Sequence, residues 1–502
     1  MRALGHWIAG VVALAAIAAA LAGLHAANSG FSVEKTVVDG TPVTIHRPAA
    51  GGAAPAILPA ILIAHGFAGS QQLMRPFAAT FARNGYVAVT FDFAGHGRNA
   101  SALAGSIVEI DGATQTLVAQ TARVAALARA LGDGRLAVLG HSMASDIVVR
   151  FAQSEPAVAA TIAVSMFAPG VTATSPRNLL VVVGDWEGAL KREALRAIGL
   201  ASAPLAAEPS TIYGQFFDGT ARRAVFSPAS EHVGVLYAAA SQGAALAWLD
   251  GTFGVVRQAE PSLDARGPWI LLLLFGAVLL AWPLARLLPV ASPEPTGAKT
   301  PWRQLALPLL LPAIATPILL RLVPTHFLPV LVGDYLAVHF LVYGLLTALC
   351  LRRRLFVRQN WRAVFVAAAA MIAYGFIAIV WPLDLFVTSF VPGGLRVVLV
   401  GAMLVGTLFY FVADEILARG TRGLYFVSKL AFLGSLALAI ALDFERLFFL
   451  AIIVPVILLF FLVYGLFGWW AYRRTGSPLA AGIANAVAFA WAIAVTFPLL
   501  AG

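Results

Sequence analysis

The chain has 502 residues, of which 60% are hydrophobic and only 12% are charged, and its formal net charge is +10. This composition excludes a single soluble domain and requires a large portion inside a membrane. The basic excess lies beyond Pro268, in loops that flank apolar spans, so it reflects membrane topology and gives no sign of nucleic-acid binding. The single Cys350 excludes a disulfide framework and a cysteine-based metal site.

An apolar stretch at residues 4–24 follows Arg2 and contains no Asp, Glu, Lys or Arg. We interpret residues 1–27 as an uncleaved signal anchor, that is, a first transmembrane helix. A cleaved signal peptide is the alternative, although the small residues Ala26 and Ala27 make a poor cleavage site. Both interpretations export the segment that follows.

Residues 28–262 alternate short apolar runs with segments of helical periodicity. Strands are predicted at residues 32–38, 43–46, 57–64, 86–90, 135–139, 159–164, 179–183 and 222–226. Helices are predicted at residues 74–84, 112–131, 144–154, 188–198 and 233–249. The alternation indicates an α/β domain whose sheet is mostly parallel, led in by two antiparallel strands and covered by helices on both faces.

The most informative stretch is Gly-His-Ser-Met-Ala at residues 140–144, between a predicted strand and a predicted helix. Gly-x-Ser-x-Ala is a variant of the nucleophile elbow, in which small flanking residues let the backbone turn sharply. The pattern predicts that the hydroxyl of Ser142 projects above the sheet. A serine hydroxyl is a weak nucleophile near neutral pH, so it needs an imidazole to take its proton and a carboxylate to hold that imidazole.

Two further motifs follow earlier strands: His-Gly-Phe-Ala-Gly-Ser at residues 65–70 and Asp-Phe-Ala-Gly-His-Gly at residues 92–97. With the elbow, they resemble the α/β-hydrolase family of the esterase and dienelactone-hydrolase type. The resemblance implies the α/β-hydrolase fold and a catalytic domain at residues 28–262. It also implies that Ser142 is the nucleophile and that the backbone N–H groups of Phe67 and Met143 form the oxyanion hole.

The same resemblance places the acid after the next-to-last strand and the base in the turn before the last helix. Glu187 stands three residues after Gly184 and is the favoured acid, with Asp185 as the alternative. His232 is the candidate base. Ser142, Glu187 and His232 therefore occur in the order expected for this fold. No metal or other cofactor is expected, because the spacing of the histidines that end other strands fits no metal motif.

Two lesser expectations concern the surroundings of this site. Residues 200–219 are rich in proline and aromatic side chains, and they either form an apolar wall beside the serine or pack as an ordinary loop. His46, in the second predicted strand, is interpreted as a surface residue.

Residues 263–502 form the second half, an all-α multi-pass transmembrane domain of about eight helices. Apolar spans are predicted at residues 269–288, 305–323, 328–351, 363–382, 395–417, 424–442, 447–472 and 479–500. Arginine-rich loops recur between every second pair of spans. Placing these loops in the cytoplasm puts the hydrolase domain outside, in the periplasm of a cell with an inner membrane or at the cell exterior.

An Asp-Glu-Ile-Leu-Ala-Arg-Gly run at residues 414–420 resembles a signature of the CAAX-protease and bacteriocin-processing membrane family. In that family a later helix carries a histidine and, four residues further on, an asparagine. This chain has Asn485 and Phe489 at these two positions. The resemblance implies a shared membrane fold without the proteolytic site, and chance similarity between apolar sequences is the alternative. Asp334 and His339 are interpreted as anchors at the membrane interface.

The sequence thus predicts a membrane-anchored serine hydrolase that cleaves carboxylic esters through an acyl-enzyme. The expected substrate is a small ester or a lipid-like ester, and the expected partner is the lipid bilayer. A peptidase or an acyltransferase with the same triad remains an alternative. So does a polytopic transport or assembly protein that carries a non-catalytic, hydrolase-like binding domain.

Overall fold

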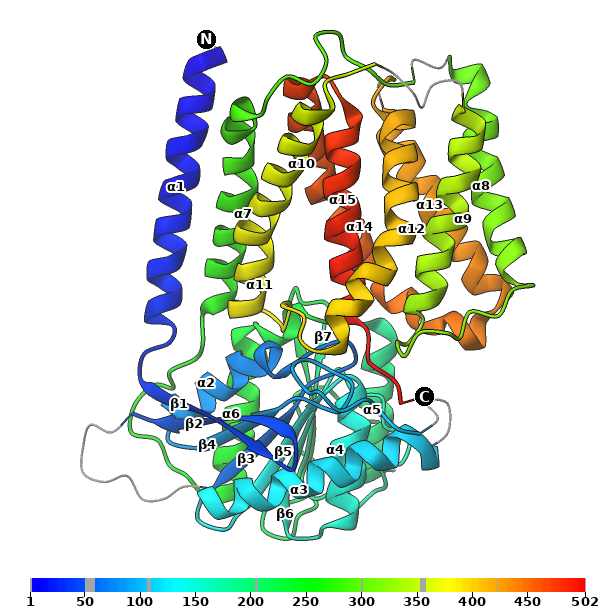
Figure 1. The fold of residues 1–502 in the computed structure, drawn as a ribbon. Helices are drawn as coiled ribbons and strands as arrows, with labels where there is room; N and C mark the ends of the chain where they lie inside the picture. The colour runs from blue at the N-terminus through cyan, green and yellow to red at the C-terminus, as the bar shows by residue number, and fades with distance from the viewer. Residues whose placement is uncertain are drawn as a thin grey trace.

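The computed structural model describes residues 2–49, 59–105, 110–203, 206–298, 301–352, 358–421 and 423–501. Within these ranges, a sheet domain carries a bundle of long helices at one end (Figure 1). Several positions used in the sequence interpretation lie outside the described residues. They are residues 57 and 58 of a predicted strand, Pro204, and four basic loop residues, Lys299, Arg353, Arg354 and Arg422.

The sheet has eight strands in the order β1-β2-β4-β3-β5-β6-β7-β8. β1 pairs with β2 and β2 with β4 in antiparallel fashion, and all other pairs are parallel. The strands are β1 Phe31–Val38, β2 Thr41–Pro48, β3 Ala60–Ala64, β4 Val87–Phe91, β5 Leu136–His141, β6 Val158–Val164, β7 Leu179–Gly184 and β8 Arg222–Ser227. The helices of this domain are α2 Arg75–Arg83, α3 Gln115–Leu131, α4 Met143–Ser154, α5 Gly188–Ser202 and α6 Ala239–Phe253.

The central strands are aliphatic along their whole length because both faces of the sheet are covered. In β3, Ile61 and Ile63 pack in one core with Phe77 of α2 and Trp248 of α6. Leu62 points to the other face and packs in a second core with residues of α3 and α4. Because helices cover both faces of the sheet, polar side chains are presented by the loops at the carboxyl ends of the parallel strands.

The bundle contains the nine helices that, within the described ranges, are long and apolar enough to cross a membrane. α1 Arg2–Ala26 packs along α7 Arg266–Leu284. α10 Trp361–Gly375 continues through a π-helical turn, Phe376–Val380, into the short α11 Trp381–Phe386. The others are α8 Ala306–Leu320, α9 Gly333–Leu351, α12 Leu395–Ala418, α13 Leu424–Leu442, α14 Phe444–Thr475 and α15 Pro478–Thr496.

The bundle contacts the sheet domain through the loop that follows β4. The amide of Leu499, after α15, donates to the oxygen of Gly95 at 2.9 Å, and the amide of Leu103 donates to the oxygen of Leu499 at 2.8 Å. Arg396 of α12 also donates from Nη2 to the oxygen of Gly95 at 2.7 Å. The carboxyl edge of the sheet is thereby held against the helix ends.

The expectations about three residues, His46, Asp334 and His339, are wrong. His46 of β2 is only 3% exposed, because β2 lies between β1 and β4 and beneath the region where α11 ends. Asp334 and His339 are both buried inside the described bundle. Asp334 accepts the amides of Phe327 and Tyr335 at the start of α9, and His339 hydrogen-bonds through Nε2 to Ser435.

Residues 200–219 do not form a wall beside the serine in the described part of that segment. The amide of Ser210 donates to the oxygen of Ala224, and Tyr213 pairs with Arg222 at the start of β8. The ring of Phe216 packs on Trp248, whose Nε1 donates to the oxygen of Asn178 just before β7. The segment therefore packs as a loop near the start of β8, at the end of the sheet away from Ser142.

Candidate active site

Ser142 occupies a sharp turn between β5 and α4. Its φ of 54° and ψ of −119° lie in a region that L-residues rarely adopt, as expected for the strained turn of a nucleophile elbow. Gly140 is required there, because a Cβ at this position would lie 2.3 Å from the backbone oxygen of Ala144. The methyl group of Ala144 itself is fully buried, so alanine fits where the usual pattern has glycine.

A chain of hydrogen bonds links the three predicted residues. His232 Nε2 lies 2.9 Å from Ser142 Oγ, and His232 Nδ1 lies 2.5 Å from Glu187 Oε1. The side chain of Glu187 is 7% exposed, whereas that of His232 is 39% exposed. The carboxylate is thus enclosed while the imidazole faces the open side of the site, where a substrate would approach.

Glu187 is fixed by two further donors. Its Oε2 accepts from Ser165 Oγ and from the amide of Gly184, both at 2.7 Å. Burial raises the pKa of Glu187, but the hydrogen bonds from His232, Ser165 and Gly184 outweigh burial and leave the pKa below its ordinary value. The group is therefore an ionised carboxylate at neutral pH. Asp185 points away and forms a 2.6 Å ion pair with Lys191 at the surface.

The predicted oxyanion donors flank the serine. Met143 opens α4 directly after Ser142, and a Cβ on Gly66 would lie 3.0 Å from the Cβ of Ser142, so the Phe67 loop closely approaches the nucleophile. Neither amide donates to another described residue, which leaves both available to a ligand oxygen. His65 anchors this loop by donating from Nδ1 to the oxygen of Gly66 at 2.8 Å and by accepting the amide of Phe93.

Burial lowers the pKa of His65 to about 4, so the ring is neutral and serves as a structural link within the loop. Two other supporting residues were not assigned a role from the sequence. His141 Nε2 lies 2.9 Å from the oxygen of His232 and holds the loop of the base. Ser165 directly follows β6 with a φ of 50°, and its position at a strand end is the signal that could have identified it.

Exposed apolar side chains occur in the loops that follow strands at the catalytic edge. Phe167 and Trp186, each shortly after a strand that ends at the catalytic edge, are 64% and 69% exposed, and Val233 beside the base is 43% exposed. On the bundle side, the ring of Phe67 packs on Phe449 of α14 with centroids 4.7 Å apart. The loop that carries one predicted oxyanion donor is therefore in contact with a helix of the apolar bundle.

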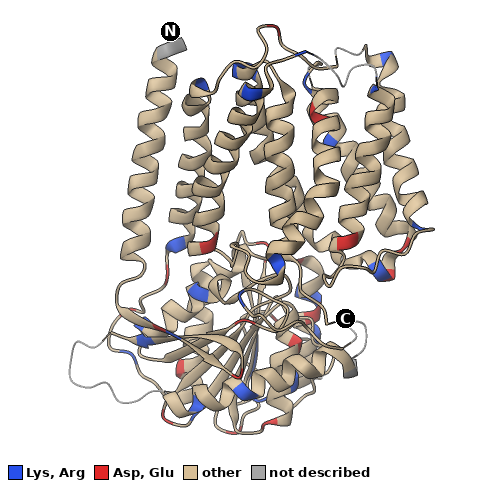
Figure 2. Ribbon diagram, viewed as in Figure 1, with Lys and Arg blue, Asp and Glu red and all other residues tan. Residues whose placement is uncertain are grey.

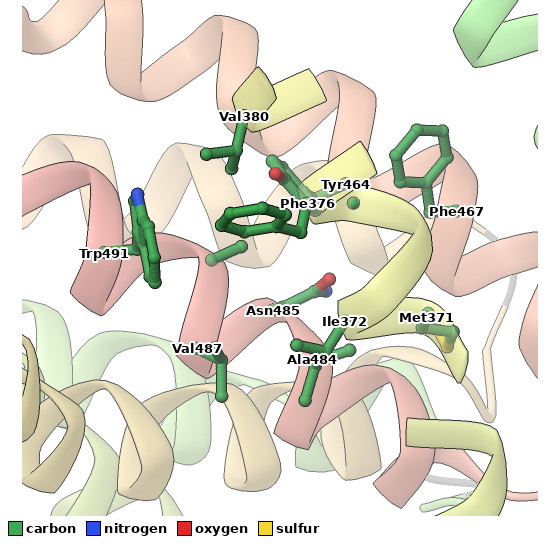
Figure 3. A pocket seen from close by; sticks show the side chains of 12 residues that line it. Met371, Ile372, Phe376, Val380, Tyr464, Phe467, Ala484, Asn485, Val487 and Trp491 are labelled. Atoms are coloured by element: carbon green, nitrogen blue, oxygen red, sulfur yellow. The ribbon is translucent and has the colours of Figure 1, made fainter. Parts of the chain in front are cut away.

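The bundle contains its own polar groups. Glu415 forms an ion pair with Arg419 and accepts from Asn485 at 3.3 Å, and Asp414 forms an ion pair with Lys429. Asn485 also lies at the wall of a cavity of about 60 Å³ between α10, α14 and α15 (Figure 3). In the described ranges, no three His, Cys, Asp or Glu side chains are grouped as ligands for a metal ion.

A family model described as serine aminopeptidase S33 matches residues 56–197. The chain is similar to TT1662 from Thermus thermophilus, at 17% identity over 45% of this chain and 99% of that one, with a TM-score of 0.32. It is also similar to the hypothetical protein PA2218 from Pseudomonas aeruginosa, at 13% identity over 42% and 89%, with a TM-score of 0.31.

A membrane phospholipase A, described as a bacterial virulence factor, is 17% identical over 48% of this chain and 92% of that one, with a TM-score of 0.31. No curated protein matches the chain. The order and direction of the strands, the strained turn at Ser142 and the matched family model agree with one another. The sheet domain of this chain therefore has the α/β-hydrolase fold of the serine-hydrolase type, joined to a region of several long apolar helices.

Proposed function

We propose that the protein is a multi-pass membrane serine hydrolase that cleaves carboxylic esters. The observation that carries this proposal is the hydrogen-bond chain from Ser142 through His232 to Glu187. An inert scaffold has no need to keep a serine in a strained conformation within reach of an imidazole that a buried carboxylate orients. We assign residues 1–27 to the signal anchor, 28–262 to the catalytic domain and 263–502 to the transmembrane domain.

In this proposal Ser142 Oγ attacks the ester carbonyl carbon while His232 Nε2 takes the hydroxyl proton. Glu187 accepts from Nδ1 and stabilises the imidazolium. The amides of Phe67 and Met143 donate to the oxyanion, and His232 then returns the proton to the departing alcohol, leaving an acyl-enzyme. Water, deprotonated by the same imidazole, attacks the acyl carbon, releases the acid and restores the serine.

Lipid-like esters are the substrates that the surroundings favour. The exposed rings of Phe167 and Trp186 give the catalytic edge an apolar rim, and such a rim suits a long acyl chain better than a charged leaving group. Phe67 lies against the bundle, so an ester that reaches the site from the bilayer meets apolar surface along its path.

The distribution of charge supports an extracytoplasmic catalytic domain. Basic residues gather at the end of the bundle away from the sheet domain (Figure 2). In the chain, Arg303 lies shortly before α8, Arg352 directly follows α9, and Arg473 and Arg474 lie in the last turn of α14. Because basic loops stay in the cytoplasm, we place the sheet domain on the other side of the inner membrane.

The test is a panel of esters with short and long acyl chains, assayed on the full-length protein in detergent and in vesicles. The wild type should hydrolyse esters, with long chains preferred, and Ser142→Ala should abolish the activity without lowering the melting temperature. Equal rates for both proteins would show that the hydrolysis does not come from this site.

A peptidase is the second candidate, because the matched family model is described as a serine aminopeptidase. Peptide anilides added to the same panel separate the two. Turnover of anilides but not of esters, lost in Ser142→Ala, would assign the triad to peptide bonds. If the folded wild type hydrolyses neither esters nor anilides, the result would favour the alternative in which the hydrolase-like domain only binds a ligand.

A further inference from the structure

A cavity of about 500 Å³ lies where the first strands of the sheet meet the end of a membrane helix. Its walls come from β1 and β2, from the start of α2, and from residues 384–386 at the end of α11. Ser142, Glu187 and His232 are not among its wall residues. Since α11 belongs to the apolar bundle, the cavity lies at the height where membrane helices end and lipid headgroups begin.

The charged side chains of the wall leave a positive excess, with Lys35, Arg75 and Arg98 opposed by Asp384. Both carboxylate oxygens of Asp384 already accept hydrogen bonds. Its Oδ2 accepts from Arg98 at 2.7 Å, and its Oδ1 accepts two backbone amides of the following loop at 2.8 and 3.0 Å. Arg98 is thereby neutralised, whereas Lys35 and Arg75 form no ion pair with any residue that the structure describes.

Arg75 is the cation that most needs a counter-charge. Among the described residues its side chain makes a single hydrogen bond, a long one of 3.5 Å from Nη1 to the oxygen of Leu385. Burial and the charge of Arg266 lower the pKa of Arg75 to about 10 against the opposing charge of Asp264, so Arg75 stays protonated at neutral pH. Asp264, the nearest acidic influence, pairs directly with Arg266 and Arg83. The half-buried guanidinium of Arg75 therefore contacts no anion among the described residues, and its planar array of donors matches the oxygens of a phosphate.

Two neutral groups of the wall also lack partners among the described residues: His46 Nδ1 and Gln72 Nε2. The Gln72 amide is oriented by its oxygen, which accepts from Ser389 Oγ at 3.0 Å, so its nitrogen is a free donor. Burial, together with the charges of Arg75 and Arg266, lowers the pKa of His46 to about 3 and keeps the ring neutral. Buried polar groups usually have partners; Gln72 Nε2 requires an acceptor, and His46 Nδ1 donates or accepts according to its tautomer.

We propose that this cavity binds the phosphate group of an anionic phosphate ester, with Arg75 and Lys35 as charge partners and Gln72 and His46 as hydrogen-bond partners. The volume is within the range of small-ligand sites and admits a phosphate with a short polar substituent. The headgroup of a phospholipid in the outer leaflet supplies this chemistry at the right height, and a soluble phosphate ester is the other source. The site stands apart from the triad, so it does not depend on the proposed hydrolysis, but its assignment to the outer leaflet rests on the proposed membrane topology.

Fluorescent phosphatidylglycerol, titrated into the full-length protein in neutral detergent, tests the proposal by anisotropy. The wild type should show saturable binding, and Arg75→Gln should weaken it about tenfold or more, because a charge-assisted contact to the phosphate is lost. Arg192→Gln removes an exposed arginine of α5 and is the matched control, with unchanged binding expected. Zwitterionic phosphatidylcholine should compete poorly.

Inorganic phosphate and glycerol phosphate, added as competitors, distinguish the two sources of the group. Displacement at millimolar concentration assigns the site to soluble phosphate esters, and retention of the lipid against both assigns it to a lipid headgroup. Lys35→Gln, on an exposed strand position, serves as the second variant if Arg75→Gln does not fold. Binding as tight as in the wild type, in a folded variant and with every ligand, would overturn the proposal.

Discussion

Replacement of Glu187 by Gln tests the assignment of the acid, because the structure dictates how the new amide would turn. Glu187 Oε2 accepts two donors, Ser165 Oγ and the amide of Gly184, each at 2.7 Å. A glutamine keeps its carbonyl oxygen at that position and turns its NH2 group toward His232. The imidazole then accepts at Nδ1 and carries its proton on Nε2, where it cannot take the proton of Ser142.

The expected loss follows from this reversal of the tautomer. In Ser-His-acid enzymes the wrong tautomer lowers kcat by about ten-thousandfold. This corresponds to about 5 kcal/mol of transition-state stabilisation. Asp185→Asn is the matched control, because the carboxylate of Asp185 is 49% exposed and, among the described residues, pairs only with Lys191, which makes it a surface ion pair of little consequence.

The assay is the steady-state hydrolysis of a chromogenic ester by each purified full-length variant, with the melting temperature measured in parallel. Glu187→Gln should lose nearly all activity while Asp185→Asn keeps most of it. A larger loss in Asp185→Asn would move the acid to residue 185 and refute the tautomer argument.

Three other outcomes follow from the structure. Gly140→Ala should lower the melting temperature and abolish activity, since its Cβ would meet a backbone oxygen at 2.3 Å, whereas Gly188→Ala, with open space around it, should be tolerated; equal melting curves would contradict this. Phe449→Ala removes the ring that packs on Phe67 and should slow ester hydrolysis roughly three- to tenfold; an unchanged rate would mean that α14 does not support the oxyanion loop. A reporter fused at Gly267 should behave as extracytoplasmic, and cytoplasmic reporter activity would reverse the proposed topology.

The sheet and the turn at Ser142 were predictable because their signals are local, whereas Glu187 and His232 were proposed through the resemblance to a family. Each strand is a short aliphatic run, and the elbow needs small residues next to Ser142 for a steric reason that the sequence displays directly. Glu187 and Asp185 are both acidic and both follow β7, but their side chains point in different directions. The sequence could rank them by spacing, but only the fold shows that Glu187 turns inward to His232 while Asp185 turns outward.

What could not be predicted depends on contacts between distant parts of the chain. His46 lies in an alternating strand whose second face is covered by a loop and a helix end more than three hundred residues away. Residues 200–219, for which both a wall beside the serine and an ordinary loop were open, pack as a loop away from Ser142, whereas Phe449 of the bundle contacts Phe67 of the predicted oxyanion loop. The length of the apolar runs predicts the spans, but it does not tell which span end meets which loop of the sheet domain.

The most direct test of the catalytic assignment is to map the residue that a fluorophosphonate modifies in the purified full-length protein. We expect a single phosphonylated peptide carrying the adduct on Ser142, with labelling lost in Ser142→Ala and strongly reduced in His232→Ala. An adduct on another serine, or a folded wild-type protein that takes up no label, would contradict the account.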